Sequence, residues 1–265
     1  MAKTLTYEQP TDELIRVCLR LELLFSQLDE AHGQHTTFWQ TRHVIEALLE
    51  ILAVVDRADL KNRFTQTLSN YGVFFSSLDS NPHVNQSSLE ALLFDIDQCI
   101  DGLHAEPSKI GQSLRERPFL NQIRQHASSS GGLIPFNTPA FHLWLHQSPT
   151  IRNQDCQRWV DSLALLRSTV TTILKITRSS KRTSKEVAKN GYFQVTFDPN
   201  HQAPLNLIQV IMDDSQTFYP RISVNKHRVS IYFYQLGPLD DRHEIHAEDH
   251  DIPFTLSCCL QQVSA

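Results

Sequence analysis

The 265-residue chain has little of what marks many enzymes. It holds only eight glycines, and it contains no glycine-rich phosphate loop, dinucleotide fingerprint, Gly-x-Ser-x-Gly elbow or His-Glu-x-x-His helix. Those motifs provide the tight turns and paired ligands that bind phosphates, activate a serine or hold zinc. The sequence therefore gives no positive indication of catalysis, and we expect a protein that is not an enzyme and needs no cofactor.

Long hydrophobic runs are also missing. The longest uninterrupted apolar stretch covers only residues 51–55, and the N-terminal sequence MAKTLTYEQP lacks the apolar core of a signal peptide. A membrane-spanning helix needs about 20 apolar residues. We therefore expect a cytoplasmic protein that is neither exported by a signal peptide nor inserted into a membrane.

The cysteines are few and odd in number, and none has the spacing of a metal finger. Two of them are adjacent, and adjacent cysteines pair with each other only under strain. Reduced cytoplasmic thiols are the simplest interpretation. The five are Cys18, Cys99, Cys156, Cys258 and Cys259.

Positive charge is in deficit, since 24 lysines and arginines face 29 acidic residues, for a net charge of -5. Binding to bulk nucleic acid relies on counterion release over a broad basic surface. An RNA-binding α+β module is one alternative, but the charge and the lack of an aromatic-basic strand signature disfavour it. Any anion site should be a local patch.

Hydrophobic residues make up 40% of the chain, enough for a substantial core. Helical spacing of the apolar residues predicts a bundle of four antiparallel helices in the first 105 residues, with Thr11 and Asp12 at the start of the first. A further helix is predicted near the middle of the chain. The periodic stretches are residues 10–28, 44–55, 60–78, 89–103 and 153–178.

The remaining segments predict shorter elements. Residues 110–126 are helical in pattern but interrupted at Pro118, and the Ser-Ser-Ser-Gly-Gly run at 128–132 breaks regular structure. Alternation of apolar and polar residues after Ser180 predicts an antiparallel sheet. The predicted extended runs are 133–136, 141–146, 192–197, 205–212, 228–234 and 254–258.

Together these patterns predict an α+β fold with two discontinuous domains. The α-helical bundle domain is expected to comprise residues 1–115 plus 151–180. The domain of β-strands is expected to comprise residues 116–150 plus 181–265.

Two histidines could suggest a metal site. If residues 141–146 form a strand, His142 and His146 project from one face with Trp144 between them. They would then lie roughly 13 Å apart along the strand, too far to share one ion without a bend. A polar surface that faces a ligand is the favoured interpretation.

The segment 240–251 is rich in histidines and carboxylates. Such a set attracts zinc or copper, and together with the strand histidines it allows a metal-dependent hydrolase as the alternative function. No apolar framework holds these side chains, so a solvated acidic loop between the last two strands is favoured. We therefore expect no bound metal.

Basic residues gather at the junction between the last predicted helix and the sheet. Such a run could contact an acidic partner, although a solvated linker is the simpler interpretation. Further basic groups stand at Arg16 and Arg20, at Arg115 and Arg117, and at Lys226 with Arg228. The residues of the run are Arg178, Lys181, Arg182, Lys185 and Lys189.

Motifs in order from Tyr7 to Cys259 resemble those of the ZapD family. The resemblance rests on local runs spread over nearly the whole chain. These are Tyr7-Glu8-Gln9-Pro10, Leu19-Arg20-Leu21-Glu22, Ile110-Gly111-Gln112 with Leu114-Arg115-Glu116, Gly131-Gly132 through Pro139 to His142-Leu143-Trp144-Leu145-His146, Asn190-Gly191-Tyr192-Phe193-Gln194, Tyr219-Pro220-Arg221-Ile222-Ser223 with Lys226 and Arg228, and Cys258-Cys259.

The resemblance implies a cell-division accessory protein with a helical domain, a smaller β-domain and a homodimeric assembly. It further implies a basic pocket for the C-terminal tail of the tubulin-like protein FtsZ, crosslinking of FtsZ filaments and a place at the midcell division ring. No nucleic acid or membrane insertion is implied. The implied tail-binding residues are Arg20, Arg115, Arg117, His142, Lys226 and Arg228.

Overall fold

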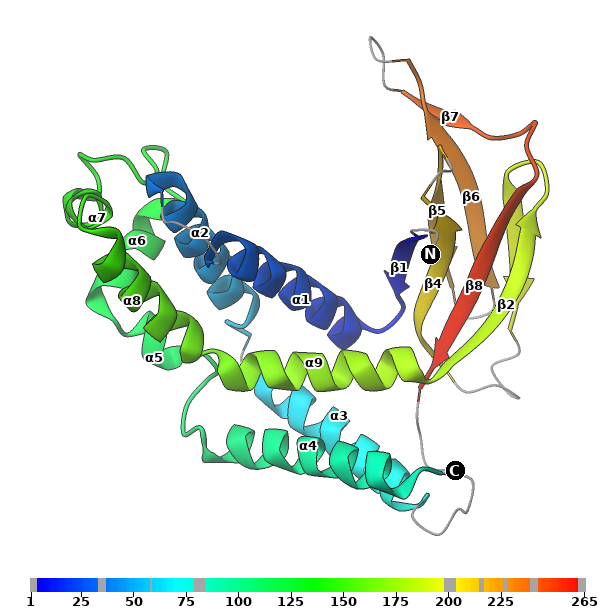
Figure 1. The fold of residues 1–265 in the computed structure, drawn as a ribbon, viewed down its shortest axis with the longest axis horizontal. Coiled ribbons are helices and arrows are strands. Elements are labelled where there is room, and N and C mark those ends of the chain that lie inside the picture. Colours follow the sequence, from blue (N-terminus) through cyan, green and yellow to red (C-terminus); the bar gives the residue numbers. More distant parts are fainter. Residues whose placement is uncertain are drawn as a thin grey trace. The chain divides into compact units, whose positions relative to one another are not determined.

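The computed structural model describes residues 4–32, 37–57, 59–78, 84–197, 204–214, 217–225, 228–238 and 243–261 (Figure 1). The chain forms two compact units. One comprises Met1–Arg16 and Leu174–Ala265, and the other comprises Val17–Ile173. We refer to them as the β unit and the helical unit.

Helices make up the helical unit and connect it to the β unit. Helix α1 begins where the Asp12 carboxylate accepts hydrogen bonds from the backbone N–H groups of Leu14 and Ile15, at 2.7 and 3.1 Å. Helix α9 ends in the β unit. The helices are α1 (Glu13–His32), α2 (Phe38–Val54), α3 (Leu60–Ser76), α4 (Gln86–Ala105), α5 (Gln112–Arg115), α6 (Pro118–Ala127), α7 (Pro139–Leu145), α8 (Pro149–Asp161) and α9 (Ala164–Ser179).

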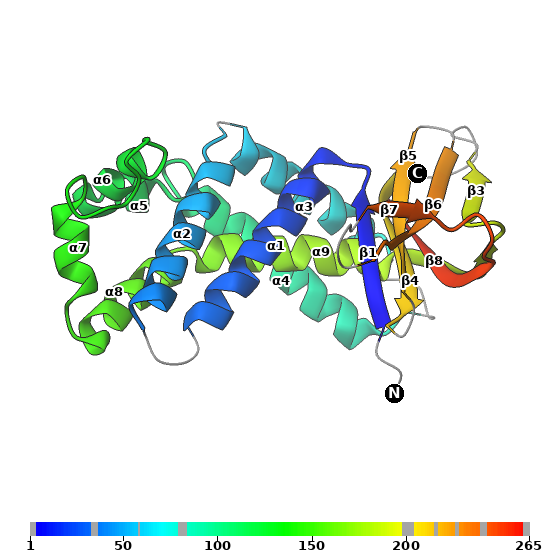
Figure 2. The same cartoon turned by 90° about the horizontal axis from the view of Figure 1, so that it is seen from above.

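The four predicted bundle helices are confirmed as α1 to α4. Each buries the apolar stripe that its spacing predicts, and α3 lies beside α4 (Figures 1 and 2). Pro118 marks the start of α6, because proline at the first helical position gives up only an N–H that would be unpaired there. The single helix expected over residues 153–178 is instead two, separated at Ser162 and Leu163.

The predicted strand at 141–146 is wrong, because these residues belong mostly to α7. The described residues 133–136 likewise form no strand. The burial of Phe141, Trp144 and Leu145 follows helical spacing, which a six-residue window does not separate from strand alternation. Segment 116–150, expected among the strands, contributes α6 and α7 to the helical unit.

The β unit contains two antiparallel sheets, which confirms the α+β class. Sheet A has the strand order β1-β4-β8-β2. Sheet B has the order β3-β6-β5, and β7 pairs with the end of β6. The strands are β1 (Thr4–Pro10), β2 (Lys181–Ala188), β3 (Tyr192–Thr196), β4 (Leu205–Asp213), β5 (Phe218–Val224), β6 (Arg228–Leu236), β7 (Glu244–His246) and β8 (Ile252–Leu260).

The inner faces of the two sheets pack on each other. Phe254 of β8 contacts Phe193 and Phe233 of sheet B, with ring centroids 5.3 and 5.2 Å apart. Strand alternation places Val229, Ile231 and Phe233 of β6 in this core, all fully buried. The alternate residues of β6 therefore point to the outer face of sheet B.

The chain passes from sheet A to sheet B at Asn190 and Gly191. Both have positive φ, 49° and 69°, as a tight hairpin turn requires. A Cβ on Gly191 would lie 2.6 Å from the Ala247 carbonyl oxygen, so glycine is needed for space as well as for conformation. The turn fixes where β3 begins.

Four strands escaped the sequence prediction, namely β1, β2, β5 and the three-residue β7. β1 was expected to lie in the helical domain, but it pairs with β4 at one edge of sheet A. β2 falls on the basic run expected to be a linker, and it pairs with β8 at the other edge. β1 and β2 are largely polar edge strands, so neither carries the apolar alternation of a central strand.

All five cysteines are free thiols. Burial, reinforced by Asp155, raises the pKa of Cys156 to about 12, and burial together with Glu8 raises that of Cys259 to about 11. These two thiols therefore stay protonated and unreactive near neutral pH.

No helix in the described ranges has the length and apolar character to span a bilayer.

Candidate partner-binding site

Arg115, at the end of α5, is buried inside the helical unit. Only 6% of its side chain is exposed, and its guanidinium donates to the carbonyl oxygens of Ile110 at 2.9 Å and Leu52 at 3.2 Å. Its Nε lies 3.6 Å from the Asp56 carboxylate. Burial lowers the pKa of Arg115, and Asp56 counteracts this effect. The side chain thus ties α5 and the preceding loop to the end of α2.

Arg20 presents the opposite situation on α1. Its side chain is 60% exposed, and its Nη2 lies 3.8 Å from the Glu50 carboxylate on α2. An ion pair this exposed is weak, since water screens both charges. Arg20 can therefore exchange Glu50 for another carboxylate at little cost.

Arg117 and His142 are both exposed on the helical unit. Arg117 is the residue before α6, and His142 lies on α7. The rings of His142 and His146 are 4.4 Å apart, because residues four apart stack on one side of a helix. The separation expected for a strand is therefore wrong.

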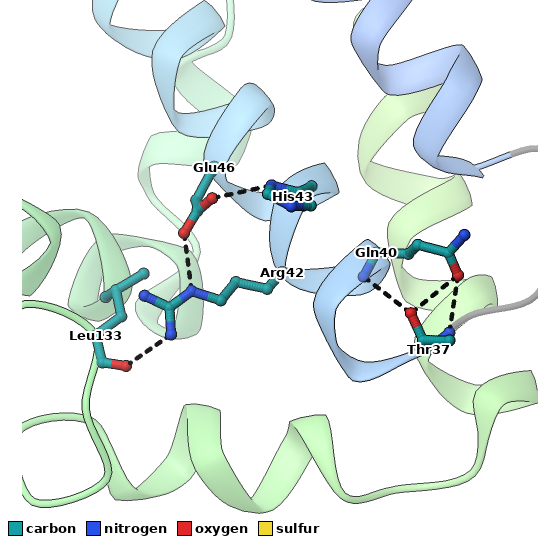
Figure 3. A network of polar contacts seen from close by, with 6 residues as sticks. All are labelled: Thr37, Gln40, Arg42, His43, Glu46 and Leu133. Carbon is teal, nitrogen blue, oxygen red and sulfur yellow. Dashed lines mark hydrogen bonds and ion pairs between the residues drawn. The ribbon is translucent and has the colours of Figure 1, made fainter. Parts of the chain in front are cut away.

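A polar network holds the loop before α7 against α2 (Figure 3). Arg42 of α2 donates to the Leu133 carbonyl oxygen at 3.4 Å and to the Glu46 carboxylate at 2.8 Å. At the start of the same helix, Thr37 and Gln40 form a capping box. The ring of Phe38 packs 5.6 Å from that of His146. These contacts position α7, which carries His142 and is followed by His146, relative to α2.

Arg228 is the candidate residue that lies in the β unit. It opens β6 and is exposed on the outer face of sheet B, and no carboxylate of the described chain pairs with it. Lys226 lies outside the described residues. No described contact joins the candidate residues of the helical unit to one another, so the structure does not gather them into one pocket. These residues are Arg20, Arg115, Arg117 and His142.

The basic run is not a linker. Arg178 lies in the last turn of α9 and pairs with Glu8 of β1 at 2.7 Å, while Lys189 pairs with Asp251 at 2.5 Å. Lys181, Arg182 and Lys185 are exposed on edge strand β2. Charged side chains on an edge strand discourage pairing with other chains. This placement gives the run a structural explanation that needs no ligand.

Metal ligands do not converge in the described part of the chain, which has no group of three or more His, Cys, Asp or Glu placed to hold an ion. The first three residues of the histidine-rich segment, 240–242, lie outside the described ranges. From Glu244 onward the segment forms β7 and the turn that leads to β8. The sequence predicted a solvated loop here, but part of the segment is a strand.

The outer face of sheet B holds residues that the sequence reasoning missed. Tyr192 of β3, Tyr232 and Tyr234 of β6, and Tyr219 of β5 lie on this face in register. The alternation Arg228-Val-Ser-Ile-Tyr-Phe-Tyr234 already places Arg228 with the two tyrosines of β6. Sequence reasoning used it only to predict the strand.

The fold and these surfaces define an α+β protein whose candidate binding residues are mostly exposed cations and aromatic rings. Comparison with known proteins specifies the family. The ZapD family profile, described as "Cell division protein", matches residues 19–232. The chain belongs to the ZapD family of cell division proteins.

Relatives support this assignment along nearly the whole chain. A cell division protein ZapD of Coxiella burnetii is 39% identical over 98% of this chain and 99% of its own length. The corresponding figures for the protein of Nitrosomonas eutropha are 35%, 96% and 98%, and for that of Aromatoleum aromaticum 32%, 96% and 97%. The protein therefore has a role in cell division.

Proposed function

We propose that this protein binds the C-terminal tail of FtsZ and, as a homodimer, crosslinks FtsZ filaments at the cytoplasmic division ring. The observation that carries the proposal is Arg228, exposed on a sheet face with no carboxylate partner in the described residues. An arginine in this state pairs with an incoming carboxylate without first breaking an internal ion pair. Membership of a family of cell division proteins supports a partner in that process.

On the helical unit the proposed contacts are Arg20, Arg117 and His142. All three are exposed, and the one described ion pair among them, from Arg20 to Glu50, is solvent-exposed. Lys226, two residues before Arg228 in the sequence, remains a proposed contact. Arg115 is proposed to support the site indirectly, because its guanidinium already donates hydrogen bonds to the carbonyl oxygens of Ile110 and Leu52. Each contact with a flexible tail is weak, since ordering the tail costs entropy.

Dimerisation makes weak tail contacts effective. A filament presents many tails, so a two-site dimer binds it by avidity and can hold a second filament with its other site. Helix α3 carries exposed Val73 and half-buried Phe74 and Phe75, and α4 carries exposed Phe94. Exposed apolar side chains of this kind suit contact with a second copy related by a two-fold axis.

The decisive experiment is a titration of a labelled FtsZ C-terminal peptide into the full-length protein. We expect saturable binding that weakens as salt increases. Absence of binding at concentrations well above those of a typical weak peptide interaction would remove the proposal. A scrambled peptide of the same composition is the matched control.

The dimer is tested separately by light scattering. We expect a mass near twice the 30.4 kDa of the chain at micromolar concentration. Phe94→Asp should yield monomers that still bind the peptide yet fail to bundle FtsZ filaments. A wild type that is monomeric under these conditions contradicts crosslinking by a dimer.

A further inference from the structure

The outer face of sheet B carries a continuous band of rings across three strands. Tyr192 of β3 packs on Tyr232 of β6, with centroids 4.7 Å apart, and Tyr219 of β5 stacks with Tyr234 at 6.1 Å. His246 of β7 links the two pairs, 5.9 Å from Tyr232 and 5.3 Å from Tyr234. We call these five residues the tyrosine face.

The tyrosine face is not part of the core. The core between the sheets uses the alternate residues of the same strands, such as Ile231 and Phe233. Tyr232 is 39% exposed and Leu236, on the same side of β6, is 55% exposed. Side chains that pack a core do not expose this much apolar area, whereas partner-binding surfaces do.

Charge on this face is uneven. Arg221 lies over the Tyr234 ring at 5.2 Å and is neutralised by Glu244 at 2.5 Å. Arg228 stands four residues before Tyr232 on β6, roughly 13 Å along the strand, and has no described ion pair. The face thus has a neutral aromatic part and one uncompensated positive end.

Small polar residues form the floor between these two parts. Ser230 lies midway between Arg228 and Tyr232 and is flanked by Gln194 of β3 and Ser223 of β5. Ser230 is buried to 6% exposure, while its two neighbours are exposed. Ser230 is the one outer-face residue of β6 between Arg228 and Tyr232.

We propose that the tyrosine face binds an extended acidic peptide, whose apolar residues lie on the rings and whose carboxylate pairs with Arg228. This inference rests on the proposed function and assigns the FtsZ tail to this face. A span of roughly 13 Å corresponds to about four extended residues, so one short segment reaches both parts. Aromatic rings favour extended and proline-containing segments, which lose little entropy when they bind.

Single-stranded nucleic acid is the other ligand that stacks on aromatic rings of a sheet. Its binding needs several cations along the phosphate backbone, and this face offers a single uncompensated arginine among the described residues. The net charge of -5 also opposes it. The peptide is therefore the ligand that the charges favour.

The test compares variants of the full-length protein with the labelled FtsZ peptide and with a labelled single-stranded RNA. Tyr232→Thr and Tyr192→Thr remove a ring while keeping a residue suited to strands. We expect each to weaken peptide binding about threefold to tenfold, and Tyr232→Phe to bind almost normally. Phe136→Ala is the matched control, because this ring is 79% exposed on the helical unit.

A second measurement does not depend on the stability of these variants. A photocrosslinking phenylalanine analogue at exposed Gln194, which lies on the outer face of sheet B opposite Ser230, should capture the peptide, and the same analogue at exposed Lys185 of β2 should not. If the wild type binds the peptide, but removing the rings does not weaken binding and Gln194 does not crosslink, the tyrosine face is not the site. The proposed function is unaffected by that outcome. Failure of the wild type to bind the peptide overturns both. RNA binding that requires the rings overturns the peptide assignment.

Discussion

Arg115 and Arg228 are the same residue type in opposite surroundings. Arg115 is buried inside the helical unit, where it donates to two carbonyl oxygens and forms an ion pair with the Asp56 carboxylate. Arg228 projects from a sheet with no described ion pair. Removing Arg115 would leave buried acceptors unpaired, whereas removing Arg228 would leave the fold untouched. Whether an arginine of a sequence motif serves folding or binding therefore depends on its burial, and the motif alone does not show burial.

The largest effect is expected for Arg115→Ala. It should lower the free energy of unfolding by about 2–4 kcal/mol, because the carbonyls of Ile110 and Leu52 lose their donor in a site that water does not reach. Urea denaturation followed by circular dichroism measures this. Arg117→Ala, two residues away and exposed, is the control and should change stability by less than about 0.5 kcal/mol.

The same comparison predicts how Arg115→Ala affects the partner. Under conditions where the variant remains folded, peptide affinity should stay close to that of the wild type. A fully stable variant that loses peptide binding would instead make Arg115 a direct contact.

Arg228→Glu should show the reverse pattern. Peptide affinity should decrease about tenfold to a hundredfold, or about 1–3 kcal/mol, because repulsion replaces a charge-assisted contact. The free energy of unfolding should hardly change. Peptide titrations at low and high salt measure the effect, and the difference between variant and wild type should shrink at high salt. Normal binding by a folded Arg228→Glu variant would exclude this end of sheet B.

Arg178 lies between these extremes, half-buried and paired with Glu8. Burial alone would raise the pKa of Glu8, but hydrogen bonds from Arg178 and Gln209 outweigh it and hold the pKa below its usual value. A carboxylate with a lowered pKa in the folded state stabilises the fold above the pKa of the unfolded chain, and this stability is lost as pH falls through the folded-state value.

Glu8→Gln should therefore cost about 1–2 kcal/mol at pH 7, with partial solvent screening included. The gap between variant and wild type should narrow below about pH 4, where the wild-type carboxyl gains a proton. Urea denaturation at pH 7 and pH 3 checks both statements. A gap that widens in acid would show that Glu8 is not stabilised as an ion.

The smallest effects are expected on edge strand β2. Lys181→Glu and Lys185→Glu should change peptide affinity and stability by only a few tenths of a kcal/mol, because both side chains are exposed and pair with no described carboxylate. The peptide titration used for Arg228→Glu measures them. If these reversals abolish binding while Arg228→Glu does not, the tail binds to β2 and not to sheet B.

Much of the secondary structure followed from the sequence because it depends on local spacing. The stripes of α1 to α4 and the central strands β4, β6 and β8 each bury one face, and burial imposes a period that can be read from the chain. Edge strands β1, β2 and β5, the short strand β7 and the short helix α7 were missed. These elements are held by contacts with segments far away in the sequence. A short or polar stretch of sequence shows no clear hydrophobic period from which they could be predicted.

The sequence by itself determined the α+β class, the main helices and central strands, and the ZapD resemblance that the family comparison confirmed. Tertiary structure alone decided that Arg115 is buried while Arg20 and Arg228 are exposed, and that four tyrosines from three strands form one face. The physical reason is that periodicity is a local property of the chain. Burial, ion pairing and ring contacts depend instead on which distant segments meet.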